Sequence, residues 1–468
     1  MLLLGRIFAA LISGALLAQA YSLNPFWPLA WLAPIPLLIA AMGASRLGAF
    51  AYGALAGVVS MALIALYFMG IAGLVPVLII TLSKALAWGA IASAVRAAAR
   101  AAPTWAAVFV FPALLAGIDT VTAATSPHGS AGALAYSQMD FIPFIQIASL
   151  GGAPAITFVV ALFASMVAFL FVKRAWVSAL APTFIIAGVL SYGVFRVPVV
   201  EPSTPSGPAR TINATLIAGD QFEGVPDDWR YVWNAYTPQI ERAADEGRRI
   251  IILPEKIAHL EPGDRAAAIE QLAEIARRRD VMIVAGADDE PENARFNRAF
   301  VFTAAGWASY DKRHMIPELE SHFALGAAHL IFEYEGVRYG VAICKDMDFA
   351  DLGREYAGVD VMLVPAWDFV DDAWLHSRMA ILRGVESGYA IARSARNGML
   401  TVSDAYGRVL QQAPSGPQTA YNVAMPTRGP GATIYARFGD VFGWLTVALA
   451  ALLIGWTILA RRRAGLGD

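Results

Sequence analysis

Long apolar segments dominate the first 196 residues of the chain and restrict what it can fold into. Only ten charged residues occur up to position 196, whereas about a quarter of the residues in a typical soluble domain are charged. A helix needs about 20 mostly apolar residues to cross a membrane. Seven such segments lie near residues 4–22, 25–42, 49–70, 74–95, 104–125, 151–172 and 176–196. The sequence therefore predicts a membrane domain over residues 1–197 with seven transmembrane helices.

The rest of the chain divides into three further parts. A Pro- and Ser-containing linker is expected at 198–209, a soluble domain at 210–430 and a last transmembrane helix at 437–460. The net charge of −2 gives no reason to expect a nucleic acid partner. A single cysteine excludes a disulfide within the chain.

Positive charges between the apolar segments predict the orientation. Loops on the cytoplasmic side carry an excess of Lys and Arg. With the N-terminus inside, the basic positions of the loops all fall on the cytoplasmic side: Arg46, Arg96, Arg100, Lys173, Arg174 and Arg461–Arg463. The soluble domain then lies outside the cytoplasm, in the periplasm of a bacterium with two membranes. An Ala-Gln-Ala sequence at 18–20 leaves open that the first segment is cleaved as a signal peptide.

Two ionisable residues, Lys84 and Asp119, lie inside predicted transmembrane segments. Such residues are expensive to bury in lipid and are candidates for function. They are also explained if Lys84 reaches the membrane surface or if the two side chains pair with each other. The sequence leaves these alternatives open.

The soluble domain shows strands that alternate with helices. Apolar strand patterns occur at 210–220, 248–255, 281–288, 359–366 and 389–396, and amphipathic helices at 227–246, 264–280 and 371–387. Hairpins are expected near 305–306 and 335–336. This mixture predicts a layered α/β domain with two sheets.

Three polar residues stand at the ends of predicted core strands: Glu255, Lys312 and Cys344. Active sites of α/β folds lie at strand ends. A cysteine, a carboxylate and an ammonium supply a nucleophile, a proton carrier and a cation for developing negative charge. A lone cysteine at the end of an apolar run is also explained by plain packing, so position alone leaves both readings open.

Short sequences around these residues favour a catalytic role over plain packing. The stretches "LPEK", "YDKRHMIP" and "YGVAICKDMDF" resemble, in order and spacing, the three signatures of the nitrilase (carbon–nitrogen hydrolase) superfamily. Combined with seven spans before and one after the soluble domain, the whole chain resembles the apolipoprotein N-acyltransferase family. Further support comes from "ALAYSQ", "RFNRAF", "HSRMAILRGVESGYAIARSARNG" and "VSDAYGRVL". The resemblance implies a multi-span α-helical membrane domain plus a nitrilase-like αββα sandwich.

The resemblance also implies residue roles. Glu255 would be the general base, Lys312 would stabilise the tetrahedral oxyanion, and Cys344 would carry the acyl group as a thioester. Glu320, eight residues after Lys312, matches a second acidic residue that assists the site, although a solvated loop carboxylate is the alternative. Asp346 stands where the family has an acidic residue that also assists. In addition, Glu386 matches a structural glutamate, for which a place in a core helix is an equally good explanation.

The implied reaction moves a fatty acyl chain from a phospholipid, through the Cys344 thioester, to the N-terminal amine of a diacylglyceryl-cysteine lipoprotein. A membrane amidase, an N-acyltransferase with another acceptor amine and an inactive scaffold are the alternatives. The chain departs from the family pattern at Lys345, where an aromatic residue is usual, and at "PELES" over 317–321. These departures put the substrate in doubt more than the covalent chemistry.

The expected partners are membrane lipids and the two substrates, with the enzyme a monomer in the bacterial inner membrane. No cofactor is expected. No metal is expected either, because the six histidines lack metal-ligand spacing. They are His128, His259, His314, His322, His329 and His376.

Overall fold

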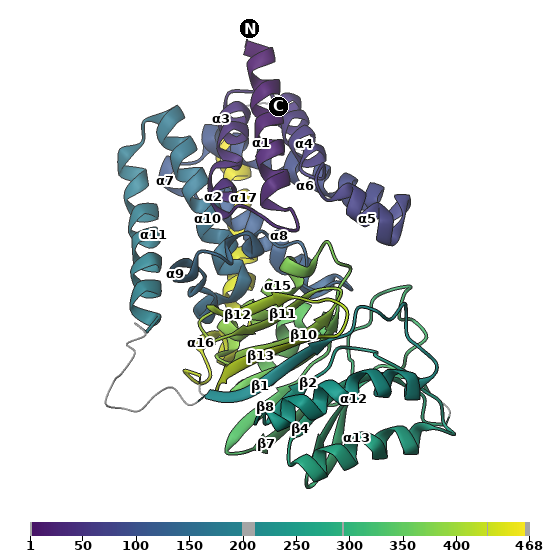
Figure 1. Ribbon diagram of the computed structural model, residues 1–468. Helices are drawn as coiled ribbons and strands as arrows, with labels where there is room; N and C mark the ends of the chain where they lie inside the picture. The colour runs from purple at the N-terminus through teal and green to yellow at the C-terminus, as the bar shows by residue number, and fades with distance from the viewer. Residues whose placement is uncertain (1, 199–210, 293, 428, 464–468) are drawn as a thin grey trace. The chain divides into compact units, whose positions relative to one another are not determined.

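The computed structural model describes residues 2–198, 211–292, 294–427 and 429–463 (Figure 1). Two compact units form. The helical unit comprises Met1–Ala124, Gly132–Val197 and Phe438–Asp468, and the α/β unit comprises Thr125–Ala131 and Pro198–Arg437. Apart from Pro198, the predicted linker 198–209 lies outside the described residues.

Six helical segments of the described chain are long and apolar enough to cross a membrane. They comprise α1 (Leu2–Ala20), α6 (Leu74–Ala101), α7 with α8 (Thr104–Ala107 and Val110–Thr125), α10 (Ala148–Lys173), α11 (Trp176–Arg196) and α17 (Val441–Arg463). The predicted multi-span helical domain is therefore confirmed as a fold class. The number of membrane crossings stays a prediction.

Two of the seven predicted N-terminal segments form only shorter apolar helices. Residues 27–42 form α2 (Trp27–Leu32) and α3 (Pro34–Met42), and residues 46–72 contain α4 (Arg46–Val59) and α5 (Ala65–Ala72). Pro34 occupies the first turn of α3. A proline is tolerated there because the first N–H groups of a helix have no partner within it. In the middle of one continuous helix the same proline would remove a backbone hydrogen bond. Gly73, at φ +80°, ends α5.

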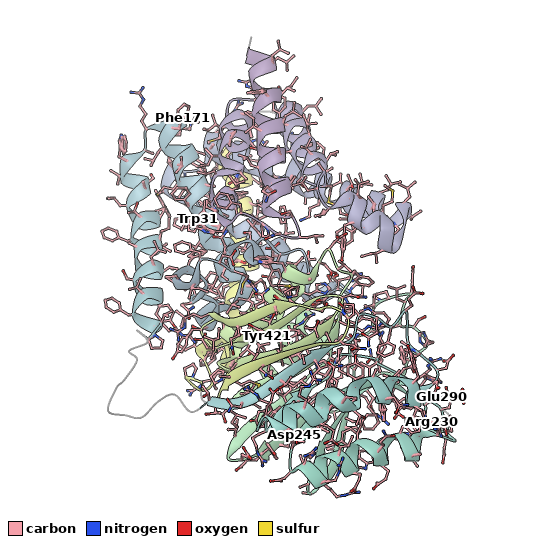
Figure 2. All side chains as sticks on the ribbon, in the orientation of Figure 1. Trp31, Phe171, Arg230, Asp245, Glu290 and Tyr421 are labelled. Atoms are coloured by element: carbon pink, nitrogen blue, oxygen red, sulfur yellow. The ribbon has the colours of Figure 1, made fainter. Side chains whose placement is uncertain are left out.

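Polar side chains of the helical unit have partners within it. Asp119 accepts hydrogen bonds from Thr157 Oγ1 at 2.8 Å and from the Leu134 N–H at 3.3 Å. The ammonium of Lys84 lies 3.8 Å from the centre of the Tyr21 ring. In the same unit Trp31, labelled in Figure 2, donates its indole N–H to Gln138 at 2.7 Å. Both ionisable side chains, Lys84 and Asp119, thus have specific partners.

The α/β unit contains two sheets. The first has the order β13-β1-β2-β4-β5-β6, with β3 also paired to β4, and the second has the order β12-β11-β10-β9-β8-β7. Strands of the first sheet are β1 (Thr211–Ala218), β2 (Ile250–Ile252), β3 (His259–Leu260), β4 (Met282–Asp289), β5 (Phe296–Thr303), β6 (Gly306–Asp311) and β13 (Thr419–Pro426). Strands of the second are β7 (Leu330–Tyr334), β8 (Val337–Val341), β9 (Val361–Trp367), β10 (Ala390–Arg396), β11 (Met399–Ser403) and β12 (Val409–Pro414).

Alternation along the strands creates three apolar layers. Ile250 and Ile252 of β2 point into the core between the sheets, while Ile251 points to the outer helices. Likewise, Leu363 of β9 faces the shared core and Met362 the outer layer. Strands covered on both faces read as continuous apolar runs for this reason.

Helices cover both outer faces. The first sheet is covered by α12 (Trp229–Asp245) and α13 (Arg265–Arg279), which lie side by side, and the second by α14 (Ala350–Glu355) and α15 (Ala373–Ser387) (Figure 1). Asp228 caps α12 by accepting from two backbone N–H groups, which satisfies donors at the helix start. The solvent side of α12 carries charged residues such as Arg230 and Asp245 (Figure 2). The predicted αββα sandwich is confirmed.

Candidate active site

The structure brings the three predicted residues Glu255, Lys312 and Cys344 into one electrostatic environment. Glu255 follows β2, Lys312 comes directly after β6, and Cys344 begins the short helix η2 (Cys344–Asp348) after β8. Lys312 Nζ donates to Glu255 Oε1 at 2.8 Å. All three side chains are buried. The charge of Glu255 raises the pKa of the Cys344 thiol, and the charge of Lys312 lowers it. Buried charges without such partners would be strongly destabilising.

Glu320 completes a buried network around Lys312. Its carboxylate accepts from Lys312 Nζ at 2.8 Å, from Lys256 Nζ and from the Ile316 N–H at 2.9 Å. Glu320 is 1% exposed, so the alternative of a solvated loop carboxylate is wrong. Its assisting role in the reaction stays a prediction.

Asn297 is a member of this network that was not predicted from the sequence. Its amide donates to Glu255 Oε1 at 2.6 Å and to Glu320 Oε1 at 2.9 Å. Asn297 lies on β5, inside the stretch "RFNRAF", where a polar residue in a buried strand was the available signal. Because the amide binds both carboxylates, it holds them on either side of the lysine in a defined geometry.

The charges of the network keep Lys312 and Glu320 ionised. Burial by itself would lower the pKa of Lys312, but the carboxylates of Glu255 and Glu320 outweigh burial and raise that pKa. Burial opposes ionisation of Glu320 as well, yet Lys312 and Lys256 lower the pKa of its carboxyl to about 2. The site therefore presents a permanent ammonium, which is the group an oxyanion needs.

Cys344 has an unusual backbone conformation. Its φ is +43°, in the left-handed region that non-glycine residues seldom adopt, and Lys256 beside Glu255 has φ +47°. Strain of this kind clusters at active sites, where surrounding structure holds it. The thiol donates toward the Trp367 carbonyl at 3.6 Å.

The thiol of Cys344 is held in its neutral form. Burial is the main reason that its pKa is raised, and the negative charge of Glu255 raises it further. Hydrogen bonding with His376 and the positive charge of Lys312 act in the opposite direction without cancelling the rise. A resting thiol of this kind needs a base before it can attack a carbonyl.

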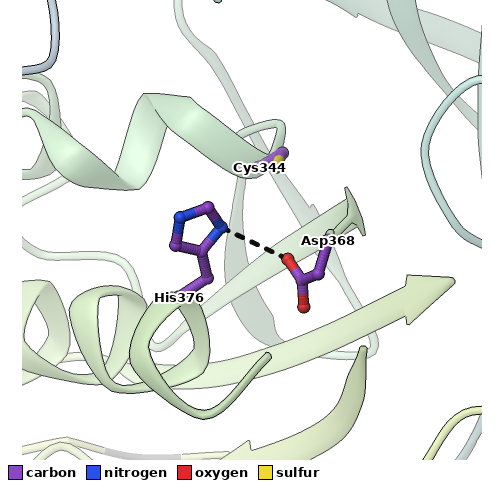
Figure 3. Close-up of side chains that lie close together, drawn as sticks. All are labelled: Cys344, Asp368 and His376. Atoms are coloured by element: carbon purple, nitrogen blue, oxygen red, sulfur yellow. Dashed lines mark ion pairs between the residues drawn. The ribbon is translucent and has the colours of Figure 1, made fainter. Parts of the chain in front are cut away.

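A second group of charged side chains also surrounds Cys344. One ligating atom each of Cys344, Asp368 and His376 lies within 4.8 Å of the others (Figure 3). His376 Nδ1 lies 3.4 Å from Asp368 Oδ1, and Nε2 lies 3.4 Å from Asp372 Oδ2. Arg393 on β10 donates to Asp368 from both terminal guanidinium nitrogens, from one of them at 2.9 Å.

These residue types can bind divalent metals, but Asp368 is already neutralised by Arg393. The absence of a metal stays a prediction. This group was not predicted from the sequence, in which His376 is only one of several scattered histidines.

Asp346 and Lys345 follow the nucleophile and have different environments. Asp346 accepts from the Tyr310 hydroxyl at 2.8 Å and from the backbone N–H groups of Ile343, Arg313 and His314. These contacts fix the loop that carries Cys344. The assisting role of Asp346 in the reaction stays a prediction.

Lys345 is directed to other partners than Lys312. Its ammonium lies 3.1 Å from His128 Nδ1 and 3.8 Å from Asp348 Oδ2. Burial lowers the pKa of Lys345. Burial, followed by the charge of Lys345, also lowers the pKa of His128. The residue that departs from the family pattern therefore forms a separate polar contact with the segment Thr125–Ala131 of the same unit.

Glu386 lies away from this chemistry on α15. Its carboxylate is 3.0 Å from Arg383 Nε, and its backbone carbonyl accepts from Thr433. Both side chains of the ion pair are buried, as expected for a structural glutamate in a core helix.

Comparison with known proteins agrees with the fold. Residues 220–425 match the family described as "Carbon-nitrogen hydrolase". The α/β unit therefore contains a carbon–nitrogen hydrolase domain, built as an αββα sandwich. Residues 13–166 match the "Apolipoprotein N-acyltransferase N-terminal domain".

The similarity to individual relatives covers both the helical region and the α/β region of the chain. An "Apolipoprotein N-acyltransferase" of Geobacter metallireducens is 26% identical, covering 95% of this chain and 94% of the relative. A protein of the same name from Vibrio parahaemolyticus is 24% identical over 69% of this chain and 70% of its own. Among solved structures, an amidase from Nesterenkonia sp. is 20% identical, with a TM-score of 0.42, covering 47% of this chain and 92% of that chain.

Over nearly its whole length the chain is similar to relatives named apolipoprotein N-acyltransferase, and its two regions match the two corresponding family models. It is a bacterial membrane protein and an acyltransferase.

Proposed function

We propose that the chain transfers a fatty acyl group from a phospholipid to an amine through a thioester on Cys344. The observation that carries this proposal is the buried ion pair of Lys312 with Glu255 in the environment of the only thiol. In this assignment Cys344 is the nucleophile, Glu255 the general base and Lys312 the oxyanion partner. Each residue supplies a different requirement of acyl transfer.

The first half-reaction forms the thioester. Glu255 takes the proton of the Cys344 thiol, and sulfur attacks the ester carbonyl of the phospholipid. Lys312 stabilises the negative oxygen of the tetrahedral intermediate. The intermediate collapses by breaking the bond to the glycerol oxygen, which receives the proton from Glu255 and leaves as the alcohol of a lysophospholipid.

The second half-reaction uses an amine as acceptor. The amine attacks the thioester carbonyl, Glu255 removes an amine proton, and collapse of the intermediate returns that proton to the sulfur of Cys344. The names of the relatives point to an apolipoprotein as the acceptor. We propose the N-terminal amine of a diacylglyceryl-cysteine lipoprotein, which is anchored in the same membrane as the donor.

Two acidic residues assist in this proposal. Glu320 binds the face of the Lys312 ammonium that is not turned to Glu255, so the lysine stays charged and oriented. Asp346 holds the backbone of the nucleophile loop through Ile343, on the N-terminal side of Cys344.

The expected setting is the inner membrane, with seven spans before the α/β unit, one after it, and that unit in the periplasm. The distribution of Lys and Arg supports this orientation. A reporter fused near Ser206 should give a periplasmic signal, and one fused at residue 468 should give a cytoplasmic signal. The same signal at both positions would mean that the number of spans is wrong.

Mass spectrometry of the purified full-length chain tests the chemistry. After incubation with phospholipid, wild-type protein should gain a long-chain acyl mass that maps to Cys344 and is released by hydroxylamine, as a thioester is. The Cys344→Ala variant should gain none. A folded wild-type protein that stays unmodified would favour an amidase that accepts short substrates, or an inactive scaffold, over the lipid reaction.

Lys345 makes a different acceptor the main competing function. It replaces the aromatic residue usual in the family and is buried against His128. Adding a lipopeptide amine to the acylated enzyme should discharge the thioester. Discharge by other amines but not by the lipopeptide would keep the chemistry and replace the acceptor.

A further inference from the structure

His376 is the residue near Cys344 that the proposed reaction leaves without a task. It lies on α15, three residues into the helix, and its side chain remains 23% exposed. Both ring nitrogens face carboxylates at 3.4 Å, Nδ1 toward Asp368 and Nε2 toward Asp372. A neutral imidazole has only one N–H, so only the doubly protonated ring can donate in both directions.

Several charges hold the ring in that form. Burial by itself would lower the pKa of His376, but Asp372 and Asp368 outweigh burial and raise it well above its usual value. The groups that face His376 are Asp368, Asp372, Asp348 and Cys344. Those that face the thiol are Glu255, Lys312, Lys345, Asp368, His376 and Arg393.

The two aspartates are themselves fixed. Asp368 follows β9 and is bound by the buried Arg393 of β10. Asp372 accepts from the Phe369 N–H at 2.9 Å. The imidazolium therefore has little freedom to move away from the sulfur, which lies within 4.8 Å of it.

We propose that His376 is a positioning residue that, as an imidazolium held between Asp368 and Asp372, favours the thiolate of Cys344. Lys312 cannot serve that purpose alone, because two carboxylates, Glu255 and Glu320, already share its charge. This inference rests on the proposed role of Cys344 as nucleophile. It adds a second source of thiol activation that is independent of the base Glu255.

The pH dependence of thiol alkylation tests the inference in the full-length protein in detergent. Iodoacetamide reacts with the only cysteine of the chain, and its rate follows the thiolate fraction. In His376→Gln the apparent pKa of the thiol should rise, and the rate at pH 7 should fall about tenfold for every pH unit by which that pKa rises. The rate should recover toward the wild-type plateau at high pH, where both thiols are ionised.

His259 provides a matched control. It is a buried histidine of the same unit that also lies between two carboxylates, 3.3 Å from Asp288 and 3.5 Å from Glu290. His259→Gln removes the equivalent imidazole–carboxylate contacts from a cluster that contains no thiol. Its alkylation profile should match the wild type.

Asp372→Asn is a second variant that keeps the imidazole and removes one of the charges that hold its proton. It should produce a smaller rise of the thiol pKa than His376→Gln does. An unchanged profile in His376→Gln, or an equal change in His259→Gln, would overturn the inference.

Failure of the proposed function gives a different result. The profile would change as expected, but no acyl adduct would form on Cys344. Conversely, an adduct in the wild type with an unchanged profile in His376→Gln would retain the function and remove the role of His376.

Discussion

Two groups of charge act on Cys344, and they are built in different ways. The lysine cluster consists of Glu255, Lys256, Lys312 and Glu320, and the histidine cluster consists of Asp368, Asp372, His376 and Arg393. Each contains two acids and two bases. The lysine cluster follows strands of the first sheet, whereas the histidine cluster belongs to the second sheet and the helix that covers it.

The two clusters differ in the exposure of the cation that acts on the thiol. In the lysine cluster, Lys312 is completely buried and held by two carboxylates, so its charge is permanent. In the histidine cluster Arg393 is buried, while the imidazolium of His376, whose pKa is raised well above its usual value, stays partly exposed. One cluster is thus suited to the bond-making steps, and the other to adjusting the state of the thiol before they begin.

The largest expected effect comes from Cys344, the residue on which both clusters act. Cys344→Ala should abolish acyl transfer, because no other thiol exists in the chain. Removing one small sulfur atom from the core should change the thermal midpoint of the full-length protein only slightly. Transfer at near the wild-type rate in this variant would exclude the thioester mechanism.

Glu255→Gln should have the next largest effect. Loss of a general base typically slows a reaction by about 10²–10⁴. Alkylation of Cys344 should not fall with acylation, because removing the negative charge of Glu255 lowers the pKa of the thiol and increases its thiolate fraction. The measurement is the ratio of the two rates in the same preparation. Equal losses of both would argue that Glu255 only maintains the structure.

Lys312→Met should slow single-turnover acylation by about 10²–10³, the usual effect of losing one oxyanion donor. Lys345→Met is the matched control, since that lysine is also buried and lies beside the nucleophile but contacts His128 and Asp348 instead. It should retain most of the activity. If Lys345→Met is inactive and Lys312→Met is active, the assignment of the oxyanion lysine is wrong.

Local sequence was enough to find three members of the lysine cluster, Glu255, Lys312 and Glu320, but not the histidine cluster. Glu255, Lys312 and Cys344 each stand in a short motif after an apolar run, and Glu320 follows Lys312 at a fixed spacing. Such motifs can be recognised in a single sequence because they consist of residues that are close together along the chain. Both sheets and their outer helices were likewise predictable from hydrophobic periodicity.

The histidine cluster depends on tertiary structure. Asp368 and Arg393 meet because β9 and β10 are parallel neighbours, and His376 joins them from α15. No periodicity specifies which strands become neighbours. For the same reason, the sequence did not indicate that Asn297 of β5 would bridge Glu255 and Glu320.

The helical unit shows another limit. The apolar run at 25–42 predicted one continuous span, but Pro34 starts a new helix after residue 33. Hydropathy identified the segment correctly as helical and apolar. It did not reveal the break, because proline counts little in an average over about 20 residues.

The smallest expected effect concerns stability in acid and separates the clusters by their pH response. Lys312 and Lys256 hold the pKa of Glu320 at about 2 against burial, whereas an unfolded glutamate has its usual value of about 4.3. The folded carboxylate is therefore stabilising above about pH 4.3. That stabilisation is lost as the pH falls toward 2, because the unfolded chain binds the proton first.

Glu320→Gln should remove this contribution. The variant should have a lower thermal midpoint than the wild type at pH 7, and the difference should shrink as the pH is lowered from 5 to 3. Asp368 has a lowered pKa as well, with Arg393 opposing burial, so the variant should keep the part of the acid response that belongs to the histidine cluster. Glu318→Gln, an exposed carboxylate two residues away, is the control and should follow the wild type. A constant difference between Glu320→Gln and the wild type at every pH would mean that the glutamate contributes through shape alone, and that the charge of the lysine cluster is balanced without it.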